Sequence, residues 1–156
     1  MATEEQKVQN QIRLAGLMLT GLTGAVWDMV GESAYVFSKG MGKHILSIME
    51  KEMGLEIAGA SPLEIGNEIG RLFADEFGFV QSIEVEELDS EIVMKVHNCV
   101  GRPSCDAIMA AGVEHPFICP VVCLGEAILA RIGGKARIRA VKWEEGNGSI
   151  IRFELF

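Results

Sequence analysis

The chain has 156 residues, a length that fits a single domain spanning residues 1–156. Hydrophobic residues make up 49% of the sequence and charged residues only 23%, so much apolar surface must enter a core, an oligomer interface or a ligand pocket. The formal net charge of -8 argues against nucleic acid as a partner and against attraction to anionic lipid headgroups.

The start of the chain gives no targeting signal. Its first residues, MATEEQ, are acidic where a signal peptide would carry positive charge. The longest nearly uncharged stretch, residues 14–27, is shorter than the roughly 20 residues that cross a bilayer as a helix. We therefore expect a cytoplasmic protein without membrane insertion, in which this stretch is a buried helix.

The first predicted helix begins at a capping box. Thr3 and Gln6 can each satisfy a free backbone donor at a helix start, and the helix should run to about Val30. Small residues recur at intervals of four along two rows of this helix: Gly16, Thr20 and Gly24, and beside them Leu17, Gly21 and Ala25. Such rows favour close helix packing, either across a homodimer or within one chain.

Two more helices are predicted before the first strand. The second spans residues 32–53 and is ended by Gly54. The third begins at Ser61, whose hydroxyl can cap a helix with proline at its first position, and is ended by Gly78. The side chains expected on the buried face of the second helix are Val36, Gly40, Ile45, Ile48 and Met49.

The second half of the chain changes to a period of two. Residues 83–97 and 137–155 predict two hairpins, which turn at 89–90 and 146–148. A short helix within residues 102–112 and a longer one over residues 120–132 lie between them. The predicted fold class is therefore α+β, with an antiparallel sheet from two hairpins packed with several helices.

The cysteines of the chain are concentrated in residues 99–123, with two of its three histidines in or beside this segment. Thiolate and neutral imidazole are ligands that soft and borderline metals prefer, so the pattern predicts a zinc site or, as a second choice, iron or an iron-sulfur cluster. Redox or covalent thiol chemistry and inert buried thiols are the alternatives. The candidate metal ligands are Cys99, Cys105, Cys119, Cys123, His97 and His115.

Two segments of the second half carry a family resemblance. HPFICPVVCLGEAILARIGG and the final IIRFELF, together with the order of the elements, resemble the 4-vinyl reductase domain family, including its stand-alone archaeal members. The resemblance implies a small-molecule, often hydrocarbon-binding domain, a fold related to ligand-binding subunits of the TRAPP trafficking complex, and a homodimer.

The cysteines depart from the pattern of that family. In its aromatic-sensing members, zinc is held by one cysteine ahead of the late helix and two in the final hairpin. Here residues 141–156 contain no cysteine, and Trp143 and Ile151 stand about where those two would be. A metal would therefore need Cys99 and Cys105 beside Cys119 or Cys123.

The function that these observations favour is binding of a small hydrophobic molecule or cofactor in an apolar pocket, with a cysteine-rich metal site. The eight methionines would suit a pliable pocket, although methionine is more often core filler. The first alternative is a metal-dependent or redox enzyme, reductase-like, that acts on such a compound. The second alternative is an interaction subunit of an assembly or trafficking type.

Overall fold

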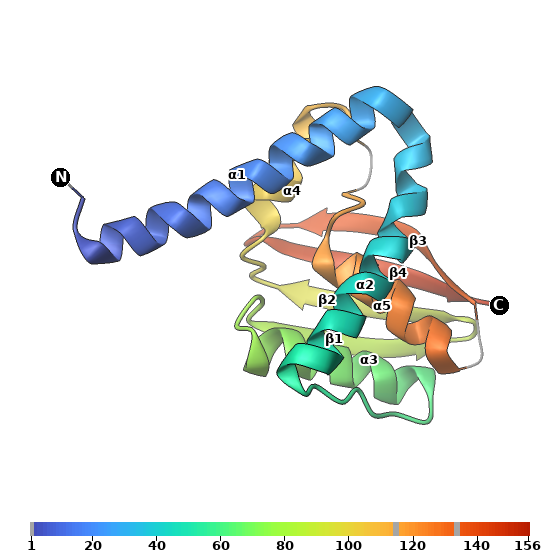
Figure 1. Ribbon diagram of the computed structural model, residues 1–156. Helices are drawn as coiled ribbons and strands as arrows, with labels where there is room; N and C mark the ends of the chain where they lie inside the picture. Colours follow the sequence, from blue (N-terminus) through green and yellow to red (C-terminus); the bar gives the residue numbers. More distant parts are fainter. Residues whose placement is uncertain (1, 114–115, 133–134) are drawn as a thin grey trace.

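The computed structural model describes residues 2–113, 116–132 and 135–156. Its sheet has four antiparallel strands in the order β1-β2-β4-β3 (Figure 1). The strands are β1 (Ser82–Leu88), β2 (Glu91–His97), β3 (Ala136–Glu144) and β4 (Gly148–Leu155). The helices are α1 (Glu4–Val30), α2 (Tyr35–Met53), α3 (Pro62–Arg71), α4 (Arg102–Ala110) and α5 (Pro120–Leu129). The predicted α+β class is confirmed.

One face of the sheet forms the floor of the core. In the register of the strands, Val85 lies opposite Met94, which lies opposite Ile151, so these side chains share a face. Ile92 and Phe153 continue the same face, and neither is exposed. Alternation sends charged neighbours to the other face, and the helices therefore cover only the apolar one.

Glycines bring the covering helices close to the sheet and to each other. A Cβ added at Gly66 of α3 would lie 2.6 Å from the Val85 side chain, and one at Gly125 of α5 would lie 2.5 Å from the Phe153 ring. Helix α2 packs on α5, where a Cβ at Gly42 would lie 2.6 Å from the carbonyl carbon of Cys123. The core is thus two layers, helices on a sheet, with α2 added over α5.

Helix α1 leaves this body as an arm (Figure 1). Its predicted start is confirmed, because the hydroxyl of Thr3 accepts the Gln6 N–H at 3.2 Å and the Gln6 side chain accepts the Thr3 N–H at 2.9 Å. Thr23 is its buried residue, and residues 4–15 are exposed on all sides. The expectation of a buried helix is therefore wrong. Helix α1 packs on α4, and all of its residues that are not fully exposed lie between Gly16 and Trp27.

The arm also changes the expectation on membranes. By length and composition alone, the helical stretch from Glu4 to Met53 is apolar enough to cross a bilayer, and 6% of its most apolar window is buried. The sequence argument had excluded a membrane span because residues 14–27 are too few. The helix extends beyond these residues at both ends, so it is long enough.

Three helix ends differ from the predictions. The second helix starts with a 3₁₀ turn at Gly31–Ala34, the third ends in a π turn at Leu72–Glu76, and the last ends in a 3₁₀ turn at Ala130–Ile132. Of the predicted buried face of α2, Met49 is buried and Ile45 packs partly buried against the core, whereas the predictions for Val36, Gly40 and Ile48 are wrong. The buried face runs along Ser38, Gly42, Leu46 and Met49 because small side chains there admit α5, whereas Val36 and Ile48 are exposed.

Candidate functional site

Three of the four cysteines belong to one buried core cluster beside α4. Cys99 follows β2, Cys105 lies on α4, and Cys119 is the N-cap residue of α5. The Cys105 thiol donates a hydrogen bond to the Cys119 sulfur, and Cys99 lies near enough to both to affect their ionisation. All four thiols are free and buried.

Backbone hydrogen bonds fix the segments that carry these thiols. The Cys99 N–H donates to the Asn147 carbonyl at 2.9 Å, which ties the exit of β2 to the turn between β3 and β4. The Cys119 N–H donates to the Pro116 carbonyl at 2.9 Å. Gly101 is required beside Cys99, because a Cβ there would lie 2.7 Å from the Phe79 ring.

The three thiols ionise unequally. The hydrogen bond from Cys105, aided by backbone N–H groups of Val121 and Val122, lowers the pKa of Cys119 despite its burial. The same hydrogen bond and burial raise the pKa of Cys105. Burial chiefly raises the pKa of Cys99. Of the two coupled thiols, Cys119 therefore loses its proton more readily than Cys105.

Cys123 does not belong to this group. Its thiol donates to the Phe117 carbonyl at 3.0 Å and lies 3.4 Å from the Ser38 hydroxyl, in the contact between α5 and α2. Burial raises the pKa of Cys123 to about 12. It is held as a neutral thiol that links two helices.

The histidines do not complete a metal site in the part of the chain that the structure describes. His97 lies on the solvent side of the sheet, where its Nε2 is 3.2 Å from a Glu84 carboxylate oxygen. His115 lies outside the described residues. Among residues 2–113, 116–132 and 135–156, no group of three or more histidine, cysteine or acidic side chains is arranged to hold a metal ion.

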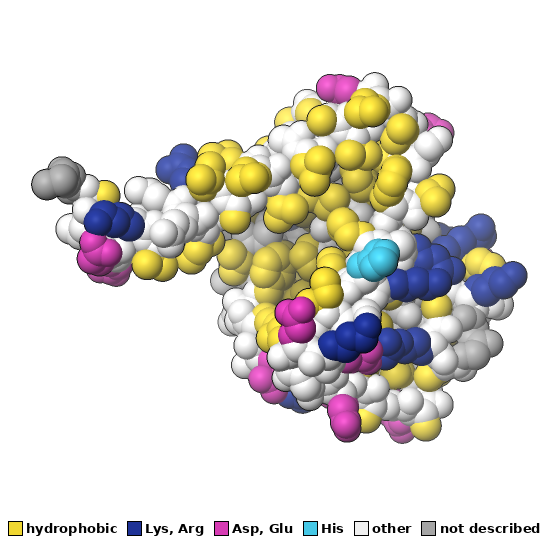
Figure 2. Space-filling model, viewed as in Figure 1, with side chains coloured by type: hydrophobic (Ala, Val, Ile, Leu, Met, Phe, Trp, Pro, Cys, Tyr) yellow, Lys and Arg dark blue, Asp and Glu magenta, His cyan; other side chains and the backbone are white. Residues whose placement is uncertain are grey.

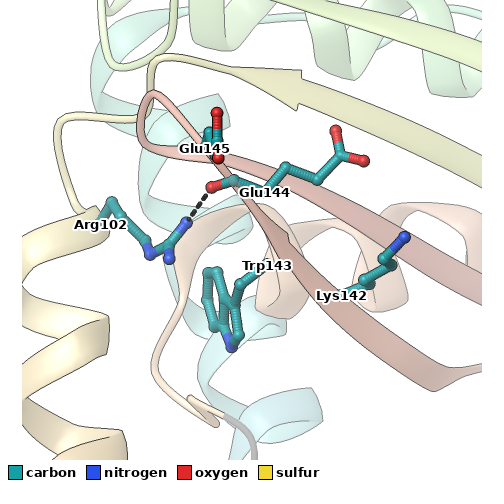
Figure 3. Close-up of a pocket in the computed structure, with 5 residues that line it drawn as sticks. All are labelled: Arg102, Lys142, Trp143, Glu144 and Glu145. Carbon is teal, nitrogen blue, oxygen red and sulfur yellow. Dashed lines mark hydrogen bonds between the residues drawn. The ribbon is translucent and has the colours of Figure 1, made fainter.

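Arg102, the first residue of α4, joins that helix to the hairpin of β3 and β4 (Figure 3). The Arg102 guanidinium donates to the carbonyl of Glu144 at 3.1 Å and to that of Gly148 at 2.7 Å. It also donates to the Asp106 carboxylate at 2.6 Å and lies 4.5 Å from the centre of the Trp143 ring. These contacts border an open hollow of about 560 Å³, which Lys142 and Glu145 also line. A second open hollow, of about 490 Å³, lies at residues 50–58.

An apolar concave surface lies between α1 and the body (Figure 2). A small core cluster at the base of α1, made of Ala34, Ile108, Val113 and Phe117, is packed against by the partly buried Trp27 and Tyr35. The ring of Tyr35 meets Trp27 at 5.7 Å and Phe117 at 6.3 Å, both edge to face. Because Trp27 and Tyr35 are only partly buried, they leave apolar area for another molecule to cover.

Comparison with protein families gives one match over most of the chain. Residues 15–155 match the family described as "Putative rubredoxin C-terminal domain". The chain belongs to this family. The search of curated proteins found no match.

The fold of this rubredoxin C-terminal domain is similar to that of a solved structure. Subunit 3 of the trafficking protein particle complex from Naegleria fowleri, in a crystal structure with covalently bound palmitic acid, matches with a TM-score of 0.56 and 12% identity. The match covers 92% of this chain and 96% of the subunit. The predicted relation in fold to TRAPP subunits is confirmed, whereas the resemblance to 4-vinyl reductase domains is not.

The description of the rubredoxin C-terminal domain family suggests metal or redox chemistry, with iron or another metal as the cofactor. It does not point to zinc in particular. Within the described residues, the cysteine cluster is where such chemistry has suitable side chains.

Sequence reasoning missed two polar residues that organise this site. Arg102 gave no periodic signal, and its role follows from contacts with a hairpin more than 40 residues later in the chain. Glu126 is buried on α5, where its carboxylate accepts the Ile138 N–H at 2.8 Å and so fixes α5 against β3. An acid inside the apolar run of residues 121–129 was the available signal for Glu126.

Proposed function

We propose that this chain binds a small hydrophobic molecule, such as a long-chain fatty acid or an aromatic hydrocarbon, against the aromatic cluster at the base of α1. The observation that carries the proposal is the contact of the partly buried Trp27 and Tyr35 rings with the buried Phe117 at the base of α1. Figure 2 shows an apolar concave surface between α1 and the body. The palmitic acid of the trafficking subunit, which has a similar fold, supports the same class of ligand.

Fluorescence of Trp27 tests this proposal. A Trp143→Phe variant keeps Trp27 as the chain's one tryptophan, and we expect saturable quenching or a spectral shift when palmitate or naphthalene is added. The matched Trp27→Phe variant should respond weakly, and Phe117→Ala should raise the half-saturation concentration about tenfold. A flat response to both compounds, with the fold intact by circular dichroism, would refute the proposal.

We infer that the arm pairs with a second copy of the chain. Large apolar side chains point away from the body over most of α1, and its glycines at 16, 21 and 24 have open space where a Cβ would stand. The apolar side chains of α1 that are more than half exposed are Val8, Ile12, Leu14, Leu17, Met18, Leu19, Leu22 and Met29. Burying such a side chain fully is worth about 1.5–3 kcal/mol, so eight of them together can exceed the roughly 4–15 kcal/mol that association costs.

The oligomeric state tests this pairing. We expect the protein to sediment as a dimer and the variant Met18→Glu, Leu22→Glu to sediment as a monomer, because two charges would enter the apolar interface. Gln9→Glu, on the exposed part of the same helix, is the matched control and should remain dimeric. A native protein that is monomeric at 50 μM would refute the inference. If that monomer sediments together with added lipid vesicles, the arm binds a membrane surface instead of a second copy.

Metal or redox chemistry at the cysteine cluster is the second candidate function. It is favoured by the convergence of Cys99, Cys105 and Cys119 and by the family description. Zinc stays a prediction. Elemental analysis of protein purified without oxygen or chelator tests it: stoichiometric zinc or iron would support a metal, and a metal-free protein would leave thiol chemistry.

A further inference from the structure

Helix α1 carries a continuous apolar seam along one side. Seven of its residues follow one another at alternating spacings of four and three, which is the heptad pattern of coiled coils. Six of the seven are exposed, and Val26 is partly buried where it packs against the core cluster at the base of α1. The residues of the seam are Val8, Ile12, Ala15, Leu19, Leu22, Val26 and Met29.

The seam carries no charge. Within residues 8–29 the charged residues are Arg13 and Asp28, and both fall at heptad positions that point away from the seam. Gln11, Met18 and Ala25, which flank the seam on one side, are uncharged as well. A partner for this face must itself be apolar, and the same seam on a second copy of the chain meets that requirement.

The body holds the seam ready for such a partner. The capping box of Thr3 and Gln6 fixes the free end of α1, and Val26 anchors its base. The side of α1 that contacts the body, with Thr23 and Trp27, lies roughly a quarter of a turn from the seam, so a second helix can reach the seam beside the body. Pairing of a helix that is already formed loses little conformational entropy.

The size of the seam suits a dimer that forms and dissociates. Residues 8–29 span roughly 32 Å of helix. Five large side chains of the seam in each copy are 54–82% exposed, and pairing would cover them. With the flanking residues, the buried area is on the order of 1,000 Å² in total, which is the lower end of specific interfaces and predicts a dissociation constant in the micromolar range.

We propose that two copies of the chain pair along this seam as a two-stranded coiled coil, with the seam of one copy packed on the seam of the other. The proposal rests on the arm pairing inferred above and names the face of α1 that performs it. The opposite side of the helix, where Leu17 lies, stays in solvent. Exposure alone does not distinguish the two sides, because Leu17 is 60% exposed and Leu22 is 63% exposed.

The test compares the same substitution on the two sides. Sedimentation of the full chain over about 1–100 μM gives the dissociation constant of each variant. Leu22→Glu should raise it at least about a hundredfold, because every dimer would bury two charges, whereas Leu17→Glu should change it by less than about threefold. Glutamate is a good helix former, so circular dichroism should show the helix kept in both.

A second pair of variants tests the seam by strengthening it. Ala15→Leu fills a seam position and should lower the dissociation constant at least about tenfold, whereas Asn10→Leu adds the same side chain outside the seam and should leave it unchanged. A dimer that Leu17→Glu dissociates as strongly as Leu22→Glu, or that both leucine additions tighten equally, would overturn the seam and leave the arm pairing intact. A native protein without any dimer would overturn both.

Discussion

The substitution Gly42→Ala tests the contact that seats α2 on α5. A Cβ at this position would lie 2.6 Å from the carbonyl carbon of Cys123 and closer still to its oxygen, and neither atom belongs to a flexible side chain. One helix must therefore move. Overpacking usually costs about 1–3 kcal/mol, and we expect the upper end or beyond because a backbone carbonyl is the obstacle.

Gly40→Ala is the matched control on the same helix. Nothing lies within 4 Å of a Cβ at Gly40, so this variant should gain about 0.5–1 kcal/mol from helix propensity alone. For a chain of this size, about 1 kcal/mol corresponds to roughly 2–4 °C in Tm. Thermal melts should therefore place Gly42→Ala several degrees below the native protein and Gly40→Ala slightly above it.

The difference between these two variants isolates the helix contact, because both make the same change in propensity. If Gly42→Ala melts at or above the native temperature, the packing of α2 on α5 described here is wrong. Retained thermal stability would also mean that the Cys123 thiol is not enclosed between α2 and α5.

Three further predictions concern polar and thiol groups. Glu126→Met should lower the free energy of unfolding by about 1–3 kcal/mol in urea, because the side-chain acceptor of the Ile138 N–H is lost; unchanged stability would contradict this. Arg102→Lys should cost about 2 kcal/mol and shift Trp143 fluorescence, since lysine lacks the planar fork; an unaltered spectrum would count against the stacking. Above pH 9 the unfolded chain releases the Cys123 proton that the fold keeps up to about pH 12, so stability should fall as pH rises, and less steeply in Cys123→Ser; parallel pH profiles would refute this.

The residues at which helices begin were predicted better than the helix faces that are buried. Thr3 and Ser61 carry local capping chemistry that works without knowledge of the rest of the chain, and both caps are present. The buried face of α2 depended instead on its partner. Two stripes were available, and the one with Ser38 and Gly42 is buried because it lets α5 approach.

The cysteine cluster was predictable in part for a similar reason. Crowding along the chain predicted convergence, and Cys99, Cys105 and Cys119 do converge. A spacing of four would place Cys119 and Cys123 on the same face of a helix only if both had helical backbone. Cys119 is an N-cap with φ -59° and ψ 120°, so its side chain leaves in another direction.

The shape of α1 has a consequence for how the protein opens. Since Thr23 is its buried residue, the amide hydrogens of residues 4–15 are protected by helix hydrogen bonds alone, whereas those of α5 lie under a closed core. Exchange with deuterated water should therefore be rapid in the arm and slow in α5 and β4. The arm can unwind and rewind without disturbing the sheet, which makes it a separately adjustable part of the molecule.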